Sequence, residues 1–328
     1  MSMMRAALLG GHGEPLQITH LPRPEPGPGQ VLIRLEASGV CHTDVHVWQG
    51  KARPATPPDP FILGHEGVGR IAALGAGVAD WAVGDPAGAA WLHDTCSVCD
   101  ECRAGQESFC QNQLAHGFSV PGTFAEYICV PAAHAVRLPG GDAPTLAPLM
   151  CAGVTAFGAI ERAALQPGET CAIFGCGGLG LYAVQLARRI GAKVIAIDPD
   201  PAKRATAIAM GAAPDDNLAP TTAHVCINFA PTPATWAPMV QGIRPRGRII
   251  AAAMVAEPVP LDQEWLTATG VTITGTSVGT RDQMRRLMQM HGAAPLQGQI
   301  TEIALDDVTM ALTLLSQGRA PGRFCIRF

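Results

Sequence analysis

The chain has 328 residues, of which 48% are hydrophobic and 15% charged, and its formal net charge is −4. This composition favours a folded protein with room for two domains and argues against disorder. The acidic balance excludes a general attraction to nucleic acids or anionic membranes. No apolar run reaches the roughly 18 residues of a membrane-spanning helix.

The cysteine content bears on the cellular compartment. The chain has 11 cysteines, and its first residues do not have the pattern of a secretory signal. We therefore expect a reducing, cytoplasmic location, where thiols bind metals more often than they form disulfides.

The first part of the chain is expected to be mostly β-structure. Proline-rich segments at 22–30 and 52–60 are expected to be exposed loops. Short runs rich in apolar and β-branched residues predict strands at 6–10, 31–40, 67–75 and 124–131.

A cluster of four cysteines follows in the segment CSVCDECRAGQESFC, with C-x₂-C-x₂-C-x₇-C spacing: Cys96, Cys99, Cys102 and Cys110. Disulfides between cysteines this close would be strained, whereas short C-x₂-C steps suit tetrahedral Zn²⁺. An iron–sulfur cluster usually has a different fourth spacing and a following proline; four unrelated buried thiols are the remaining alternative. Because four thiolates leave no open coordination position, such a zinc would be structural. This lobe spans about 93–112.

Strands and helices alternate from about residue 147. A helix is expected over 147–165, and further helices over 175–192 and 199–212. Strand-like runs lie at 170–175, 193–198, 224–230, 247–254 and 271–276. This order predicts a parallel, doubly wound sheet with right-handed crossovers. The tail, with helices at 281–290 and 306–318 and a strand at 323–328, is expected to return to the first domain.

A glycine-rich loop joins the first of these strands to its helix. The G-x-G-x-x-G glycines permit a tight turn, close approach of a pyrophosphate and helix–strand packing. Asp198 ends the next strand, where a carboxylate binds ribose hydroxyls and repels a 2′-phosphate, so we expect NAD, with Lys203 bordering the ribose. The alternative is a glycine turn in a domain that binds no nucleotide. The loop residues are Gly175, Gly177, Gly178, Leu179 and Gly180.

Three dispersed residues, Cys41, His65 and Cys151, each lie at the boundary of an expected element. Two thiolates and one imidazole would form a three-ligand zinc site with an open fourth position, which a catalytic zinc requires. Each residue taken alone is more often a packed core thiol or a satisfied surface histidine than a metal ligand.

With the four-cysteine lobe and the nucleotide loop, these residues resemble the zinc-dependent alcohol dehydrogenases of the medium-chain dehydrogenase/reductase family over essentially the whole chain. The resemblance implies an α/β protein with a GroES-like, mostly-β catalytic domain at 1–152 and 279–328, and a Rossmann NAD-binding domain at 153–278. It also implies two Zn²⁺ ions per chain, one structural, in the four-cysteine lobe, and one catalytic, on Cys41, His65 and Cys151.

The resemblance assigns further roles around the catalytic zinc. Glu66 is similar to a carboxylate that assists ligand exchange, and Asp44 to the acid that orients the zinc histidine. Thr43 would accept the alcohol proton, which His46 would pass to solvent. For the cofactor, His42 would contact the pyrophosphate and Thr155 the nicotinamide.

The implied reaction is hydride transfer between a primary alcohol and NAD. Family members often carry a tryptophan where this chain has Ala52, so a wider pocket walled by Trp48 and Trp91 would favour benzylic or medium-chain alcohols. The segment 211–224 is short, and the sheet is expected to lack one covering helix there. We expect a homotetramer, with a homodimer as the alternative, and the edge segment VTITGT is a candidate pairing surface.

Two other functions remain open. One is an NADPH-dependent aldehyde, iminium or enone reductase with the same fold, and the other is a non-enzymatic zinc-binding protein that retains it. The acidic charge argues against a zinc-ribbon that binds nucleic acid. The remaining histidines are expected to be ordinary surface or loop residues: His12, His20, His93, His116, His134, His224 and His291.

Overall fold

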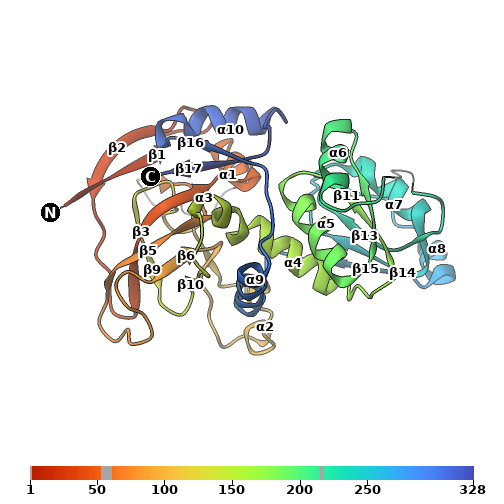
Figure 1. The fold of residues 1–328 in the computed structure, drawn as a ribbon, viewed down its shortest axis with the longest axis horizontal. Coiled ribbons are helices and arrows are strands. Elements are labelled where there is room, and N and C mark those ends of the chain that lie inside the picture. Colours follow the sequence, from red (N-terminus) through yellow and green to blue (C-terminus); the bar gives the residue numbers. More distant parts are fainter. Residues whose placement is uncertain (1, 53–60, 215–217) are drawn as a thin grey trace. The chain divides into compact units, whose positions relative to one another are not determined.

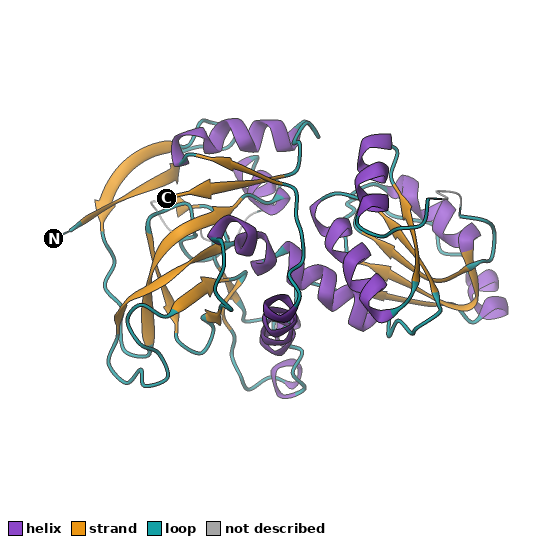
Figure 2. Ribbon diagram, viewed as in Figure 1, coloured by secondary structure: helices purple, strands orange, loops and turns teal. Residues whose placement is uncertain are grey.

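The computed structural model describes residues 2–52, 61–214 and 218–328 (Figure 1). It separates into two compact units, Met1–Cys151 with Thr280–Phe328 and Ala152–Gly279. Most of the loop expected at 52–60 lies outside the described residues. Strands dominate the first unit, whereas helices lie on both sides of the sheet of the second (Figure 2).

The first unit contains a three-stranded sheet, a seven-stranded sheet and a separate two-stranded sheet. The three-stranded antiparallel sheet has the order β2-β1-β4, from β2 (Gln17–Pro22), β1 (Met3–Leu9) and β4 (Phe61–Ile62). The larger sheet has the order β10-β6-β5-β3-β17-β16, and β9 also pairs with β3. Its strands are β3 (Gln30–Gly39), β5 (Gly67–Leu74), β6 (Pro86–Ala89), β9 (Tyr127–Pro131), β10 (Val136–Arg137), β16 (Ile300–Ile303) and β17 (Arg323–Arg327).

β3 is central because its apolar residues are buried: Val31, Ile33 and Leu35 are all at most 2% exposed. The C-terminal strand β17 pairs antiparallel with the end of β3, with Cys325 opposite Gly39 (Figure 1). This pairing carries Arg323 from the end of the chain to the part of the unit that holds Cys41.

Short elements complete the first unit. A two-stranded sheet, β7 (Leu92–Asp94) with β8 (Leu114–Ala115), flanks the four-cysteine lobe. The helices are α1 (His42–Trp48), α2 (Asp100–Arg103), η1 (Glu107–Phe109), α3 (Ala143–Leu146), η2 (Ala147–Met150), α9 (Arg281–Ala293), η4 (Leu305–Asp307) and α10 (Val308–Ser316). α10 packs on α1 through a helical stripe of buried residues, Val308, Ala311, Leu312 and Leu315.

The second unit is a parallel sheet with the order β12-β11-β13-β14-β15. Its strands are β11 (Thr170–Phe174), β12 (Lys193–Ile197), β13 (Ala223–Asn228), β14 (Ile243–Ala251) and β15 (Thr272–Gly275). Its helices are α4 (Ala152–Arg162), α5 (Gly178–Ile190), α6 (Pro201–Ala209), η3 (Pro233–Thr235), α7 (Trp236–Gly242) and α8 (Gln263–Thr269). The predicted doubly wound fold is confirmed.

The short segment between α6 and β13 has no helix within its described residues, 210–214 and 218–222. Leu218 packs instead against α7, so closely that a Cβ on Gly242 would lie 2.2 Å from its Cδ2 atom. The described part of this segment therefore contributes a packed leucine, and no helix, to this side of the unit.

Within the described residues no single helix is long and apolar enough to cross a membrane. Two consecutive helical segments with a bend between them, Ala143–Met150 and Ala152–Arg162, together have the length and composition of a span, on those two criteria alone.

Candidate metal centres and nucleotide site

The first candidate metal centre lies in the first unit. One ligand atom from each of Cys41, His65, Glu66 and Cys151 lies within 4.8 Å of the others, and all four residues are buried. Cys41 is the N-cap of α1, and His65 and Glu66 precede β5. Cys151 interrupts the helix expected over 147–165, which is instead η2 followed by α4. The structure thus gathers the three residues predicted to bind the catalytic zinc, together with Glu66.

Asp44 organises this centre from the first turn of α1. Its Oδ2 accepts a hydrogen bond from the Cys41 backbone N–H at 2.8 Å, and its Oδ1 accepts one from the Gly64 backbone N–H at 3.1 Å. The same Oδ1 lies 3.1 Å from Nδ1 of His65. Because Nδ1 bonds to Asp44, Nε2 is the nitrogen available to a metal.

The free nitrogen of His65 is the observation that best tests the fit of a metal. His65 is 0% exposed, and its Nε2 has no hydrogen-bond partner among the described residues. A buried polar atom without a partner is costly, and two thiol sulfurs lie in the same cluster. This set of two sulfurs and one imidazole suits a zinc ion with an open position.

The charges in the cluster favour an ionised ligand. A hydrogen bond with Cys151 lowers the pKa of the Cys41 thiol well below its ordinary value, against the effect of burial, and His65 and Arg323 add to the lowering. Burial opposes protonation of His65, but the charge and hydrogen bond of Asp44, together with Cys41, outweigh it and raise the pKa of His65. This lowering of the pKa favours the thiolate form of Cys41, which is the form that binds metal.

Glu66 is held by a residue that the sequence analysis did not identify. Arg323, 257 residues away in the chain, donates from Nη2 to Glu66 Oε1, and both side chains are buried. Burial raises the pKa of Glu66 to about 7, although Arg323 opposes the rise. Glu66 Oε2 has no hydrogen-bond partner among the described residues. No local motif marks Arg323, because strand pairing at the end of the chain brings it to Glu66.

The predicted relay residues share α1 with the ligand Cys41. Thr43 Oγ1 lies 4.0 Å from the Cys41 sulfur. Thr43 and His46 are both half-buried, and their i, i+3 spacing places them on one face of the helix. His42, which precedes them, is exposed.

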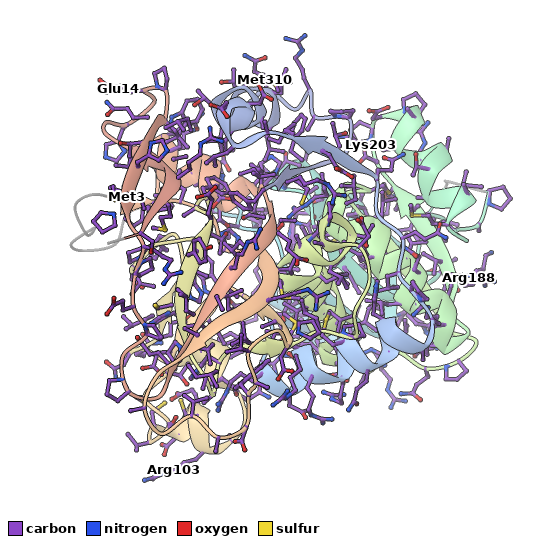
Figure 3. All side chains as sticks on the ribbon, turned by 60° about the vertical axis from the view of Figure 1, so that its left-hand side comes forward. Met3, Glu14, Arg103, Arg188, Lys203 and Met310 are labelled. Carbon is purple, nitrogen blue, oxygen red and sulfur yellow. The ribbon has the colours of Figure 1, made fainter. Side chains whose placement is uncertain are left out.

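The two predicted pocket tryptophans lie in different surroundings. Trp48 is buried in the core of the first unit and donates from Nε1 to the carbonyl oxygen of Glu14, a residue labelled in Figure 3. Trp91 lies beside the metal centre: its ring packs edge-on against His65, with centroids 5.1 Å apart and an interplanar angle of 88°. Trp91 also contacts Phe118 at a centroid distance of 5.6 Å. Their role as substrate-pocket walls stays a prediction.

The second candidate metal centre is the four-cysteine lobe, in which all four thiols are free and the sulfurs lie within 4.8 Å of one another. Backbone N–H groups point at the sulfurs: that of Cys99 lies 3.4 Å from Cys96 Sγ, and that of Cys102 lies 3.5 Å from Cys99 Sγ. Backbone hydrogen bonds from Val98 and Cys99 lower the pKa of Cys96 to about 6. Arg103, at the end of α2 in this lobe, is exposed (Figure 3).

The lobe is tied to the C-terminal part of the chain through Glu107. This buried carboxylate accepts from the backbone N–H of Arg281 at 2.8 Å and from its Nε at 3.3 Å. Arg281 begins α9, so one ion pair joins the lobe to the returning tail.

The glycine loop of the second unit has the geometry that its motif predicts. Gly175 has φ +91°, and a Cβ on Gly180 would lie 1.9 Å from the Gly175 carbonyl oxygen. Gly177 is the N-cap of α5, which begins at Gly178 and Leu179. Only glycine fits at Gly175, which needs a left-handed backbone, and at Gly180, which needs a close helix–strand contact.

Asp198 follows β12 and is linked to the glycine loop. Its Oδ2 accepts from the Cys176 backbone N–H at 2.8 Å, and its Oδ1 accepts from the Asp200 backbone N–H at 3.0 Å. Lys203 lies on α6, close after Asp198 in the chain, and is labelled in Figure 3. Thr155 is buried on α4.

Three of the histidines expected at the surface or in loops are buried, and one of them, His291, also lies on a helix, so for it the expectation is wrong. His116 is 0% exposed, and His134 and His291 are each 6% exposed. Each ring bonds to groups that sequence spacing does not reveal. Nε2 of His134 lies 3.3 Å from Thr95 Oγ1, and Nδ1 of His291 accepts from the Leu296 backbone N–H.

Comparisons with known proteins agree with this architecture. The chain matches the family models "Alcohol dehydrogenase GroES-like domain" over residues 27–140 and "Zinc-binding dehydrogenase" over residues 178–292. It is 34% identical to an alcohol dehydrogenase from Moraxella sp. (strain TAE123), over 99% of each chain.

Two solved structures are also similar. A cobalt- and zinc-bound thermostable alcohol dehydrogenase from Pyrobaculum aerophilum matches with a TM-score of 0.90 and 29% identity, over 100% of both chains. Acetophenone reductase from Geotrichum candidum NBRC 4597, in complex with NAD, matches with a TM-score of 0.88 and 27% identity, over 100% of this chain and 98% of the other. The chain therefore belongs to the zinc-binding alcohol dehydrogenases of the medium-chain dehydrogenase/reductase family, oxidoreductases that interconvert alcohols and carbonyl compounds such as aldehydes.

Proposed function

We propose that the protein is a zinc- and NAD-dependent dehydrogenase of primary alcohols, working in either direction. The observation that carries this proposal is the buried, partnerless Nε2 of His65 in a cluster with the Cys41 and Cys151 sulfurs. Asp44 holds the other nitrogen of the same ring. The Pyrobaculum relative was solved with zinc and the Geotrichum relative with NAD, which supports both cofactors.

Cys41, His65 and Cys151 would hold the catalytic zinc, and Cys96, Cys99, Cys102 and Cys110 the structural one. The catalytic ion would supply Lewis-acid polarisation of the alcohol or carbonyl oxygen, and NAD would supply the hydride acceptor. Glu66 offers a further carboxylate oxygen in the cluster, and Arg323 compensates part of its charge. Glu66 would thus assist exchange of the ligand at the open position.

The residues of α1 would move the alcohol proton. Thr43 would accept it at Oγ1, and His46, one helical turn further, would carry it towards solvent. Trp91 would wall the substrate pocket, with Trp48 supporting α1 from the core. We expect benzylic or medium-chain primary alcohols to fit better than ethanol.

The NAD-binding residues would be those of the second unit. The glycine loop would approach the pyrophosphate with the N-terminus of α5 behind it, and His42 would add a contact to the phosphates. Asp198 would bind the ribose hydroxyls with Lys203 at its border, and Thr155 would lie against the nicotinamide. The carboxylate of Asp198 favours NAD over NADP because it repels a 2′-phosphate.

Removal and return of zinc test this proposal. The purified protein is assayed for NAD⁺ reduction with benzyl alcohol before dialysis against a chelator, after it, and after zinc is added back. We expect activity to fall with loss of the first zinc equivalent and to return with zinc but not with magnesium, since thiolate ligands disfavour magnesium. Full activity in the metal-free protein would refute the proposal.

The assembly and the compartment stay predictions. A homotetramer, or failing that a homodimer, would use exposed edges such as β15, and sedimentation equilibrium of the purified protein would measure the subunit number. A cytoplasmic location agrees with the 11 free cysteines.

A further inference from the structure

Two histidines that the sequence analysis treated as ordinary residues form a pair beside Trp91. Nδ1 of His93 lies 2.9 Å from Nε2 of His116, and the rings meet edge-on with centroids 4.7 Å apart. His116 is fully buried, whereas His93 is half-buried.

The hydrogen bonds of the pair determine which nitrogens carry protons. Nδ1 of His116 lies 2.6 Å from the carbonyl oxygen of Ala90, which can only accept, so this nitrogen carries the N–H. Burial lowers the pKa of His116 to about 3, so its ring is neutral and its Nε2 has only a lone pair. His93 must therefore donate from Nδ1 to His116 Nε2.

Local backbone geometry directs both rings to this place. In the β7–β8 pair, Leu92 faces Ala115 and Asp94 faces Leu114, so His93 is an extra residue, as in a β-bulge. Bulges re-aim a side chain from its regular direction. His116 follows β8, and its backbone N–H donates to the Trp91 carbonyl oxygen at 3.0 Å.

His116 thus bonds to the backbone of Trp91 and of the residue before it, while the Trp91 ring itself donates from Nε1 to Gln113 Oε1 at 3.3 Å. Its side chain bonds to the carbonyl of Ala90 and its backbone to that of Trp91. Its loop also packs on the metal centre: a Cβ on Gly117 would lie 2.5 Å from the Gly64 carbonyl oxygen, and Thr123 N–H donates to that oxygen at 3.0 Å. Gly64 directly precedes His65.

The Trp91 ring contacts two other rings, those of His65 and Phe118. Phe118 lies two residues after His116, and its backbone N–H donates to the Ala115 carbonyl at 3.3 Å. The Trp91 ring that packs on His65, and the Phe118 ring that packs on Trp91, are therefore both carried by backbone next to or bonded to His116.

We propose that His116, oriented by His93, is a positioning residue that fixes the Trp91 ring against His65 and so determines which alcohols fit beside the metal. This inference rests on the proposed function, in which His65 binds the catalytic zinc and Trp91 walls the pocket. Neither histidine takes part in the chemistry itself.

Three variants test the pair. His116→Asn keeps an N–H donor where Nδ1 lies and loses the acceptor for His93, whereas His116→Gln keeps a group where Nε2 lies and loses the Ala90 bond. His93→Ala removes the donor at a half-exposed position, where folding is least at risk. The matched control is His291→Asn, another buried histidine of the same unit that bonds to Leu296.

The first readout is the ratio of kcat/KM for benzyl alcohol to that for ethanol. We expect His116→Gln and His93→Ala to change this ratio about tenfold, the scale of a small change in pocket shape, with two zinc ions retained. The change in this ratio should come from KM and should have the same direction as in Trp91→Ala. The ratio of His116→Asn should lie between those of these variants and that of wild type. The control should keep the wild-type ratio.

The second readout does not depend on activity. The near-ultraviolet circular dichroism of Trp91, obtained by subtracting the spectrum of Trp91→Phe, should weaken in the pair variants and persist in His291→Asn. A wild-type ratio and a wild-type Trp91 signal in His93→Ala and His116→Gln would overturn the inference. If zinc-loaded wild type oxidised no alcohol, the proposed function and the pocket role would both be refuted, whereas an active wild type with unchanged pair variants would refute this inference alone.

Discussion

Asp44 and His65 form a buried pair in which Oδ1 of the carboxylate lies 3.1 Å from Nδ1 of the imidazole. The side chains are 1% and 0% exposed. A carboxylate on one nitrogen fixes the ring and raises the basicity of the other, which is the usual arrangement around a zinc-bound histidine. Here the same carboxylate also receives the N–H groups of Cys41 and Gly64, so it positions two predicted ligands at once.

Replacing Asp44 with asparagine should weaken zinc binding. The amide keeps the shape but removes the charge and turns one acceptor into a donor that faces backbone N–H groups. We expect a loss of about 10- to 100-fold in zinc affinity or in kcat/KM, measured by zinc retention against a chelator and by steady-state kinetics. Asp306→Asn, at an exposed ion pair with Arg5, should behave as wild type. An Asp44→Asn variant with wild-type zinc retention and kinetics would contradict this role.

The two cysteine clusters should respond differently to the loss of one thiol. Cys151→Ser removes a ligand of the proposed catalytic site, so we expect activity to vanish while the melting temperature changes little. Cys102→Ser removes a ligand of the closed four-thiol site, where metal binding contributes folding free energy, so its melting temperature should fall markedly. Zinc content should drop from two ions to one per chain in both variants. Unchanged zinc content in either would show that its cluster does not bind zinc.

Asp198 and Asp200 offer a matched test of cofactor choice. Asp198→Asn removes the charge expected to repel a 2′-phosphate, so the preference for NAD⁺ over NADP⁺ should fall by about tenfold, the effect of roughly 1.4 kcal/mol. Asp200 caps α6 by accepting from the Ala202 N–H, and asparagine caps helices equally well. Asp200→Asn should therefore leave the kcat/KM ratio of the two cofactors unchanged. If the preference for NAD⁺ over NADP⁺ fell equally in both variants, the proposed role of Asp198 would be refuted.

His116 should contribute to the pH dependence of the free energy of unfolding. Its pKa falls from 6.5 to about 3 in the folded protein, so between these values the unfolded chain binds one more proton. The stability that the neutral ring provides is present above pH 6.5 and is lost as the pH falls. In His116→Asn the slope of unfolding free energy against pH, measured by urea denaturation near pH 5, should be smaller by about 1.4 kcal/mol per pH unit. Parallel slopes in the two proteins would contradict the buried, neutral state of His116.

An irregular, bulged part of β14 stores backbone strain. Arg246 has φ +62°, a left-handed conformation that costs a residue with a Cβ about 1–2 kcal/mol. Glycine removes this strain but makes the unfolded chain more flexible. Arg246→Gly should therefore stabilise the protein by up to about 1 kcal/mol. Arg244→Gly should destabilise it, because glycine makes the unfolded chain more flexible and residue 244 has no left-handed backbone for glycine to relieve. Denaturant titration measures both, and destabilisation by Arg246→Gly would refute the strain.

Local motifs were enough to predict the parallel sheet of the second unit and the four-thiol lobe of the first. The glycine loop before α5 and the strand–helix alternation indicated the parallel sheet, and the C-x₂-C steps indicated the four-thiol lobe. Cys41, His65 and Cys151 stood out only through the resemblance of their surrounding segments to a known family, because none of them is near another in sequence.

The residues that sequence reasoning missed depend on contacts between distant segments. Arg323 reaches Glu66 because β17 pairs with β3, and no property of the last residues indicates that pairing. His93 and His116 are 23 residues apart and meet because β7 and β8 form a bulged pair. A lone histidine in a sequence has the same appearance whether its ring is exposed or buried, so its partners must be known before its role can be inferred.

The most direct test of the central claim is the initial rate of nicotinamide reduction by the zinc-loaded protein with benzyl alcohol, using NAD⁺ and NADP⁺ in parallel. We expect rapid reduction of NAD⁺ and at most weak reduction of NADP⁺. No reduction of either cofactor by a protein that holds two zinc ions per chain would contradict it.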